Sequence, residues 1–403
     1  MKIDPGPVPG PVRGFRFSGV HGGLKPRGRR DLALIVADRP AVCAAVFTAN
    51  RAAAAPVVVA REHISSGLAQ AVMINSGSAN AATGEKGLTM ARWGCRELAA
   101  RLSTTPEMIL PCSTGVIGVQ LERVPFARAI SLAVDGLSKN GFGAAARAMM
   151  TSDAFPKWSQ QKIRLDDTEV TVAGMAKGAG MIHPNMATML AVVMTDAVVA
   201  GEAARAILAA AVARSFNRIS VDGDTSTNDT VVLMASGVAA GPRVESVSSP
   251  TYQSLCDAVT SIMDDLARQI VCDGEGATKV VDVVVGGAAD DDQAGRVARA
   301  IATSTLVKAA LAGADPNWGR IVCAIGNSGV DVDQGSLAID VDDVALVRDG
   351  TLVSDGARRM ARKAMRKDSF TLAVTVGRGR GKATVVTNDI TEAYVRFNSA
   401  YTS

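Results

Sequence analysis

The chain has few of the residues on which metal sites and disulfide frameworks depend. Its 403 residues include only 3 histidines, which are scattered, and no His-Glu-x-x-His run occurs. The 6 cysteines form no Cys-x-x-Cys pair and no ladder of short spacings. We therefore expect reduced core thiols in a cytoplasmic protein, with no metal and no resident cofactor.

Excess basic charge and aromatic side chains are also scarce. Lys plus Arg number 43 against 39 Asp plus Glu, and there are only 3 Trp, 3 Tyr and 9 Phe. Nucleic-acid-binding proteins usually concentrate basic charge on one face and often stack bases on aromatic rings. The composition therefore argues against a nucleic-acid partner.

Long apolar runs are absent as well. No stretch of about 18 uncharged apolar residues occurs, so we expect no membrane-spanning helix. The first residues, Met1–Arg13, are rich in proline and glycine and are not expected to form a secretion signal. The length allows two domains or one large one, but no repeat and no linker divides the chain.

Short apolar runs alternating with amphipathic segments predict an α/β protein. Leu88, Ala91, Cys95 and Leu98 recur at spacings of three and four, which predicts a helix over Gly87–Leu102. Further helices are predicted over Glu202–Arg214, Tyr252–Val271 and Ala289–Ala302. Strands are predicted at Leu32–Ala37, Ala44–Thr48, Val57–Ala60, Ala71–Asn75, Leu190–Thr195, Val280–Val285 and, after a turn at Asn317–Gly319, Ile321–Ile325.

The region near the end combines a basic amphipathic helix with a predicted hairpin. The helix has an alanine and methionine stripe around Met360 and Ala361, opposite a row of Arg and Lys. Such a helix could lie on a membrane, but a stripe without Trp or Phe favours packing on a sheet. Phe370–Val376 and Ala383–Val386 flank a glycine-rich tip and predict a β-hairpin.

The most informative stretch runs from Lys177 to Leu190 and contains Ala187-Thr188 just before a strand. The Thr188 hydroxyl could attack the carbonyl of Ala187, and hydrolysis of the resulting ester would make Thr188 an N-terminus. An N-terminal threonine is nucleophile and base in one residue, since its amine has a reference pKa of about 7.7–8.0. The spacing alone favours an ordinary turn before a strand.

Long motifs from end to end favour the self-cleaving interpretation. Because of these motifs, the chain resembles the ornithine acetyltransferase family, the glutamate N-acetyltransferases of arginine biosynthesis. The motifs that carry the resemblance are Gly14–Arg29, Asp31–Val36, Asn75–Gly84, Ser113–Gly118, Lys177–Leu190, Ser215–Thr230, Asp273–Lys279, Asp315–Ile321 and Tyr394–Asn398.

The resemblance implies an α/β fold of layered helices and mixed sheets, of the self-cleaving ornithine acetyltransferase type. Cleavage before Thr188 would leave chains 1–187 and 188–403, intertwined and assembled as an α2β2 heterotetramer. The implied reaction moves the acetyl group of N2-acetyl-L-ornithine to L-glutamate through an acetyl-threonine enzyme. Some members of the family also accept acetyl-CoA, and no feature of this sequence separates the two kinds.

The resemblance also implies which residues form the site. Thr114 and Gly115 would bind the oxyanion, since a hydroxyl and a backbone N–H in a Ser-Thr-Gly turn can point at one developing charge. Lys177 could pair with a substrate carboxylate, and Glu275 could accept from a substrate ammonium. The implied substrate contacts are Thr151, Lys177, Thr188, Glu275, Asn398 and Ser403, the last of which replaces the usual threonine.

Two alternatives remain open at this stage. A self-cleaving amidase or aminopeptidase of related fold would give the acyl group to water, so that acetate would appear in place of N-acetylglutamate. A non-catalytic amino-acid-binding protein would stay uncut, which the intact Ala187-Thr188 pair and the pocket residues argue against. His183, although close to Thr188 in sequence, is interpreted as structural because the amine of Thr188 can serve as the base.

Overall fold

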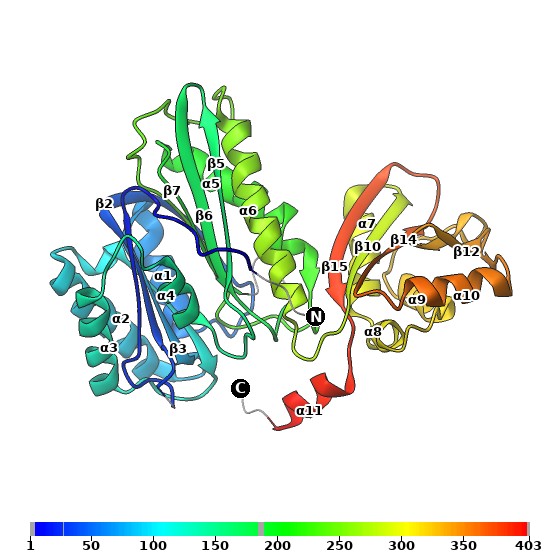
Figure 1. Cartoon of the computed structure of the whole chain (residues 1–403), viewed down its shortest axis with the longest axis horizontal. Helices are drawn as coiled ribbons and strands as arrows, with labels where there is room; N and C mark the ends of the chain where they lie inside the picture. The colour runs from blue at the N-terminus through cyan, green and yellow to red at the C-terminus, as the bar shows by residue number, and fades with distance from the viewer. Residues whose placement is uncertain (1–4, 27, 184–188, 401–403) are drawn as a thin grey trace.

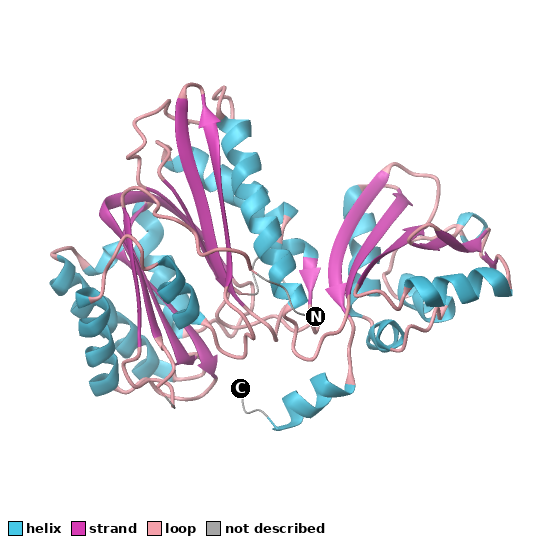
Figure 2. Ribbon diagram, in the orientation of Figure 1, coloured by secondary structure: helices cyan, strands magenta, loops and turns pink. Residues whose placement is uncertain are grey.

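The structure is a computed structural model that describes residues 5–26, 28–183 and 189–400. Two mixed β-sheets, each covered by helices, form two lobes and confirm the predicted α/β class (Figure 1, Figure 2). The first sheet has the strand order β4-β3-β2-β9-β7-β6-β5, with β1 paired to β2. Its strands are β1 Phe15–Val20, β2 Leu32–Phe47, β3 Leu68–Ser78, β4 Ile109–Val116, β5 Lys157–Leu165, β6 Thr168–Lys177, β7 Leu190–Thr195 and β9 Thr230–Ala235.

Helices cover both faces of the first sheet. Val172 and Ala173 are consecutive in β6, yet Val172 packs in the core beneath α6 and Ala173 in the core beneath α4. This alternation is the period-two pattern of a strand that is buried on both faces. The helices of this lobe are α1 Ala55–His63, α2 Gly84–Leu102, α3 Arg123–Asp135, α4 Phe142–Met149, α5 Gly201–Arg214 and α6 Tyr252–Cys272.

The second lobe is built on a sheet of order β13-β12-β11-β14-β10-β15-β8. Its strands are β8 Ile219–Ser220, β10 Val280–Ala288, β11 Ala338–Val341, β12 Val344–Arg348, β13 Thr351–Leu352, β14 Ser369–Thr375 and β15 Gly381–Asn388. Its helices are α7 Asp291–Thr303, α8 Thr305–Ala312, α9 Trp318–Gly326 and α10 Asp355–Ala364. A separate apolar core joins these helices to β10, β14 and β15.

The last helix links the two lobes. After β15 the chain forms α11, Glu392–Ala400, which runs back beneath the first lobe (Figure 1). Thr391 at its start donates a hydrogen bond to the carbonyl of Gly276, 2.7 Å away, in the loop after α6. The end of the chain therefore approaches the loops at the bottom of the first sheet.

Most predicted elements are confirmed. The strand predicted at Leu190–Thr195 is β7 with the same bounds. The helix predicted over Gly87–Leu102 is α2, which begins three residues earlier, and the helix predicted over Tyr252–Val271 is α6, which ends one residue later. The basic helix is α10, which packs against β12 through buried Ala361 and Ala364, whereas Met360 of the predicted stripe is exposed. Packing on the sheet is therefore confirmed.

Two predicted strands are wrong because they are helices. Val57–Ala60 belongs to α1, where Pro56 occupies the first turn, and Ile321–Ile325 belongs to α9, where the Asn317 side chain accepts from the N–H of Arg320. A run of four or five apolar residues cannot separate a buried strand from a buried helix by periodicity. The Pro and Asn at the helix starts were the better signals.

The predicted hairpin is also wrong. β14 and β15 are both strands, but β10 lies between them, parallel to β14 and antiparallel to β15. The two strands predicted at Leu32–Ala37 and Ala44–Thr48 are one long strand, β2, whose pairing with β3 is irregular between Val36 and Ala41.

All six cysteines are free thiols, and only Cys323 is exposed. Burial raises the pKa of Cys112 to about 12.

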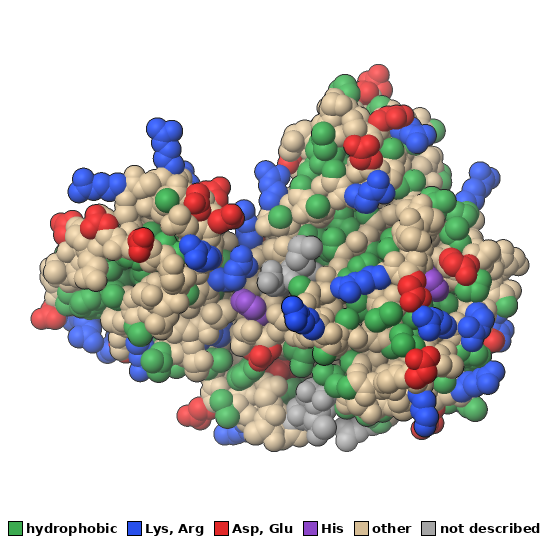
Figure 3. Space-filling model, turned by 180° about the vertical axis from the view of Figure 1, so that it is seen from behind, with side chains coloured by type: hydrophobic (Ala, Val, Ile, Leu, Met, Phe, Trp, Pro, Cys, Tyr) green, Lys and Arg blue, Asp and Glu red, His purple; other side chains and the backbone are tan. Residues whose placement is uncertain are grey.

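In the part of the chain that the structure describes, no helix has the length and apolar character needed to cross a membrane. The face opposite to that of Figure 1 shows Lys and Arg side chains interspersed with Asp and Glu (Figure 3).

Candidate active site

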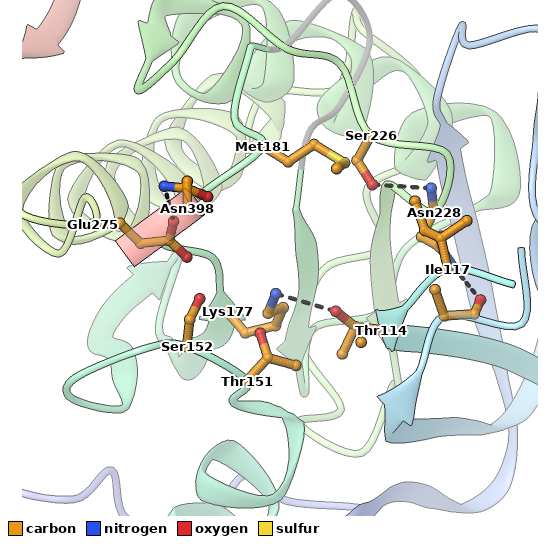
Figure 4. A pocket seen from close by; sticks show the side chains of 13 residues that line it. Thr114, Ile117, Thr151, Ser152, Lys177, Met181, Ser226, Asn228, Glu275 and Asn398 are labelled. Atoms are coloured by element: carbon orange, nitrogen blue, oxygen red, sulfur yellow. Dashed lines mark hydrogen bonds between the residues drawn. The ribbon is translucent and has the colours of Figure 1, made fainter. Parts of the chain in front are cut away.

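Six of the nine predicted site residues line one cavity (Figure 4). They come from distant parts of the chain: the end of β4, the loop after α4, the end of β6, the loop after α6, and α11. Ala187, Thr188 and Ser403 lie outside the described residues. The six are Thr114, Gly115, Thr151, Lys177, Glu275 and Asn398.

Thr114 and Gly115 form one wall, at the end of β4. Gly115 pairs with Gly77 of β3 and has a φ of +131°. A Cβ at Gly115 would lie 2.4 Å from the carbonyl carbon of Gly77, so a side chain does not fit. The close approach of the two strands therefore requires glycine at position 115, and this residue lines the cavity.

Lys177 reaches across to this wall. Its Nζ donates a hydrogen bond to Thr114 Oγ1 at 3.1 Å (Figure 4). Because the threonine oxygen accepts from lysine, its own O–H stays available as a donor. A hydroxyl backed by a positive charge can stabilise a developing oxyanion more strongly than a hydroxyl alone.

Asn228 fixes the loops behind Thr114. Its Nδ2 donates to the carbonyl of Ala79 at 2.6 Å and to the carbonyl of Ser113 at 2.9 Å. These two bonds tie the loop before β9 to the ends of β3 and β4. The position of Thr114 is therefore set by a side chain that follows it by more than a hundred residues.

Glu275 and Asn398 form the opposite wall. Asn398 Nδ2 donates to Glu275 Oε2 at 3.1 Å, and the N–H of Glu275 donates to the carbonyl of Ala179 at 2.9 Å. The glycines beside Glu275 permit this packing. A Cβ on Gly276, which has a φ of +70°, would lie 2.5 Å from the backbone nitrogen of Tyr394.

Three buried charges lie behind the cavity. Lys157 Nζ, with a fully buried side chain, donates to Asp153 Oδ1 at 2.7 Å and to Asp273 Oδ2 at 2.6 Å. Asp153 also accepts from the N–H of Thr151 at 2.8 Å and of Gly178 at 2.6 Å. The triad therefore joins the segments that carry Thr151, Lys177 and Glu275.

The two carboxylates of the triad titrate in opposite directions. Burial opposes ionisation of Asp153, but the charges of Lys157 and Lys177 hold its pKa well below the ordinary value. Burial raises the pKa of Asp273, and Lys157 offsets this only in part. Lys177 gives Asp153 a second positive neighbour, whereas the charge of Asp153 raises the pKa of Asp273 further.

Several residues of the site were missed by sequence reasoning. Asn228 and Ser226 line the cavity and lay inside a recognised motif, Ser215–Thr230, but no role was assigned to either. Lys157 gave no signal, because nothing local separates a buried lysine in a strand from an exposed one.

His183 does not line the cavity; its Nδ1 lies 3.2 Å from Ser220 Oγ, and burial lowers its pKa. Among the described residues, no group of three or more His, Cys, Asp or Glu is placed to hold a metal ion.

Comparison with known proteins identifies the family. The sequence model of the ArgJ family matches residues 16–403. A protein of Geobacter sulfurreducens named "Arginine biosynthesis bifunctional protein ArgJ" is 45% identical over 390 residues, which cover 97% of this chain and 99% of that protein. A protein of the same name from Methylococcus capsulatus is 44% identical over 395 residues, covering 97% and 96%. The solved ArgJ structure from Bacillus halodurans is 40% identical, with a TM-score of 0.49 over 51% of this chain and 96% of that one. The chain therefore belongs to the ArgJ family and is an acetyltransferase of arginine biosynthesis.

Proposed function

We propose that this enzyme transfers the acetyl group of N2-acetyl-L-ornithine to L-glutamate in a ping-pong cycle, and that it also accepts acetyl-CoA as a donor. The observation that carries this proposal is the polarity of the cavity. Lys177 lies on one side of it and Glu275 on the other. A cation and an anion on facing walls suit the carboxylate and the ammonium group of an amino acid.

The residues would divide the chemistry among them. Thr188 would attack the acetyl carbonyl, with its own α-amine as the base. The Thr114 hydroxyl and the Gly115 N–H would stabilise the tetrahedral oxyanion. Ornithine would leave, and the amine of glutamate would take the acetyl group from the Thr188 ester.

The remaining substrate contacts would orient the amino acid. Thr151 and Asn398 offer hydrogen bonds from the cavity lining, and Ser403 would add a hydroxyl from the end of the chain. The acceptor also separates this proposal from the hydrolase alternative, which family membership does not favour. A transferase should form N-acetylglutamate, whereas a hydrolase should release acetate.

We further propose that the chain cuts itself between Ala187 and Thr188 and works as an α2β2 heterotetramer. The mature chains would be 1–187 and 188–403, which share the first sheet, since β7 and β9 follow Thr188 and the other strands of that sheet precede it. Such chains cannot separate without breaking the sheet. Free thiols, five of them buried, fit a cytoplasmic location.

The denatured mass of purified enzyme after brief exposure to N-acetylornithine tests this function. We expect two fragments divided before Thr188, with one acetyl group added to the C-terminal fragment. Glutamate added before denaturation should remove the acetyl group and yield N-acetylglutamate. A folded preparation that stays a single unmodified chain would contradict both the cleavage and the acyl-enzyme.

Replacing Thr114 by valine should lower kcat by about 10²–10³, because the change keeps the shape of the side chain and removes one oxyanion donor. KM for N-acetylornithine should change little, since the donor acts mainly in the transition state. Steady-state kinetics measure both constants. Thr89→Val, on the exposed surface of α2, is the control and should leave both unchanged. A kcat within threefold of the wild type in Thr114→Val would rule out the assignment.

A further inference from the structure

A second cavity, of about 400 Å³, shares a wall with the active-site cavity. Ile117 lines both cavities. Along two neighbouring loops the lining also alternates: Ala79 and Asn228 face the active-site cavity, while Ala81 and Thr227 face the second one. The wall between the two cavities is therefore one residue thick.

Hydrogen bonds hold this wall in place. The N–H of Gly118 donates to the carbonyl of Ala81 at 2.9 Å, and Asn228 Nδ2 donates to the carbonyl of Ala79 at 2.6 Å. Ile117, the residue on which the two cavities meet, packs against the small apolar cluster of Ala54, Val57, Ala79 and Ala81. Its side chain is half-buried, and neither of the two hydrogen bonds of the wall involves it.

The second cavity differs from the first in chemistry. The active-site cavity contains Lys177 and Glu275, whereas the polar side chains of the second are Thr83 and Thr227. The second cavity, called the apolar cavity below, suits a ligand that is mostly uncharged and apolar with a few hydrogen-bonding groups. The rest of its lining is Ala52, Ala53, Ala55, Val58, Ala81, Ala82, Gly84, Leu88 and Ile117.

The two volumes decide what each cavity can hold. The active-site cavity, of about 110 Å³, is the smaller of the two. Pockets for larger ligands span about 300–1,000 Å³, a range that includes the apolar cavity. A donor that carries its acetyl group on a long arm must therefore extend beyond the active-site cavity.

We propose that the apolar cavity binds the pantetheine arm of an acyl-coenzyme A donor, which passes over Ile117 to place its thioester at Thr114 and Gly115. This inference rests on the proposed function, which includes acetyl-CoA as a donor. The nucleophilic hydroxyl attacks the thioester carbonyl and the C–S bond breaks. The leaving thiolate takes the proton that the hydroxyl gave to the base, and the acetyl ester remains for glutamate.

Basic side chains near the apolar cavity suit the phosphate groups at the other end of the coenzyme. Arg51 is exposed and adjoins Ala52, and Lys86 is exposed in the first turn of α2, two residues after Gly84. Both lysine and arginine bind phosphate oxygens. The start of α2 adds the unpaired N–H groups of a helix N-terminus, because its N-cap residue makes no side-chain cap bond.

An Ala52→Trp variant tests the proposal by placing an indole at the exposed rim of the apolar cavity. We expect KM for acetyl-CoA to rise at least tenfold, with kcat/KM for transfer from N-acetylornithine to glutamate unchanged within twofold. A second variant that fills the cavity, Leu88→Trp, should likewise affect the reaction with acetyl-CoA and spare the reaction with N-acetylornithine; the two variants are called plugs below. Val238→Trp adds an indole beside a different cavity, at a residue 52% exposed, and should change neither reaction.

Other results would overturn the proposal in distinguishable ways. If both plugs reduced the two reactions equally, the cavity would have no special relation to the coenzyme. If the wild type used N-acetylornithine but not acetyl-CoA, the proposed transfer would survive and the coenzyme site would not. If the plugs changed only the native mass, the cavity would be a contact between copies of the chain. A wild type inactive with N-acetylornithine would instead count against the proposed function.

Discussion

Replacing Thr188 by alanine is expected to leave a single chain of 403 residues without acetyltransferase activity. The variant lacks the hydroxyl that would attack the carbonyl of Ala187, so the ester needed for cleavage cannot form. It also lacks the nucleophile of the acyl-transfer cycle, and no other hydroxyl of the proposed site has an α-amine on the same residue to act as its base. Denatured mass and an assay of N-acetylglutamate formation measure the two losses independently.

Thr188→Ser is the matched control, because it keeps the hydroxyl and loses only a methyl group. We expect this variant to be cut at the same bond and to keep measurable activity. Two fragments from Thr188→Ala would show that another group performs the cleavage. Full activity in an uncut Thr188→Ala chain would remove Thr188 from the mechanism altogether.

Local sequence patterns are sufficient to predict the helices and strands whose buried residues recur at a regular spacing. The stripe of α2 and the uninterrupted apolar run of β7 are both set by neighbouring residues, and both were predicted. The order of strands in the second sheet is set by contacts between distant segments instead. The glycine-rich tip between β14 and β15 resembles a hairpin turn, and nothing in it indicates that β10 inserts between the two strands.

The site shows the same division. Lys177 and Glu275 look like ordinary surface charges, and only their family motifs singled them out before the structure placed both on one cavity. Asn228, which anchors the wall of Thr114, lay in a motif but carried no distinguishing chemistry of its own. The sequence gives no sign of the apolar cavity, since its lining comes from separate segments and five of its eleven residues are alanines.

Lys157→Met is expected to destabilise the protein by about 3–5 kcal/mol, the usual cost of removing one partner from a buried ion pair. The change leaves Asp153 and Asp273 buried without their shared cation, while methionine keeps most of the side-chain length. Activity should also fall, because Asp153 holds the backbone N–H groups of Thr151 and Gly178 beside the cavity. Urea unfolding at pH 7 measures the change in the free energy of unfolding.

Lys162→Met is the matched control from the same strand, β5. Lys162 is also ion-paired, to Glu169 at 2.8 Å, but the two side chains are 62% and 60% exposed. An exposed pair of this kind contributes about 0–1 kcal/mol, so the control should unfold almost like the wild type. Equal losses in the two variants would show that burial of the Lys157 triad has no special role in stability.

The pH dependence of the Lys157→Met variant gives the explanation a second test. Without the lysine, the folded-state pKa of Asp273 is expected to rise further above its unfolded value of about 3.9, and that of Asp153 to rise from its lowered value while Lys177 still opposes the rise. A buried carboxyl with a raised pKa does not change the free energy of unfolding below its unfolded pKa, where it is protonated in both states. As the pH rises through the folded pKa, it destabilises the folded state. The difference from the wild type should therefore shrink as the pH falls toward about 4, where the wild type is also losing the stability that the lowered pKa of Asp153 provides. A difference that stays constant between pH 7 and pH 4 would point to lost packing of the lysine stem, not to unpaired charge.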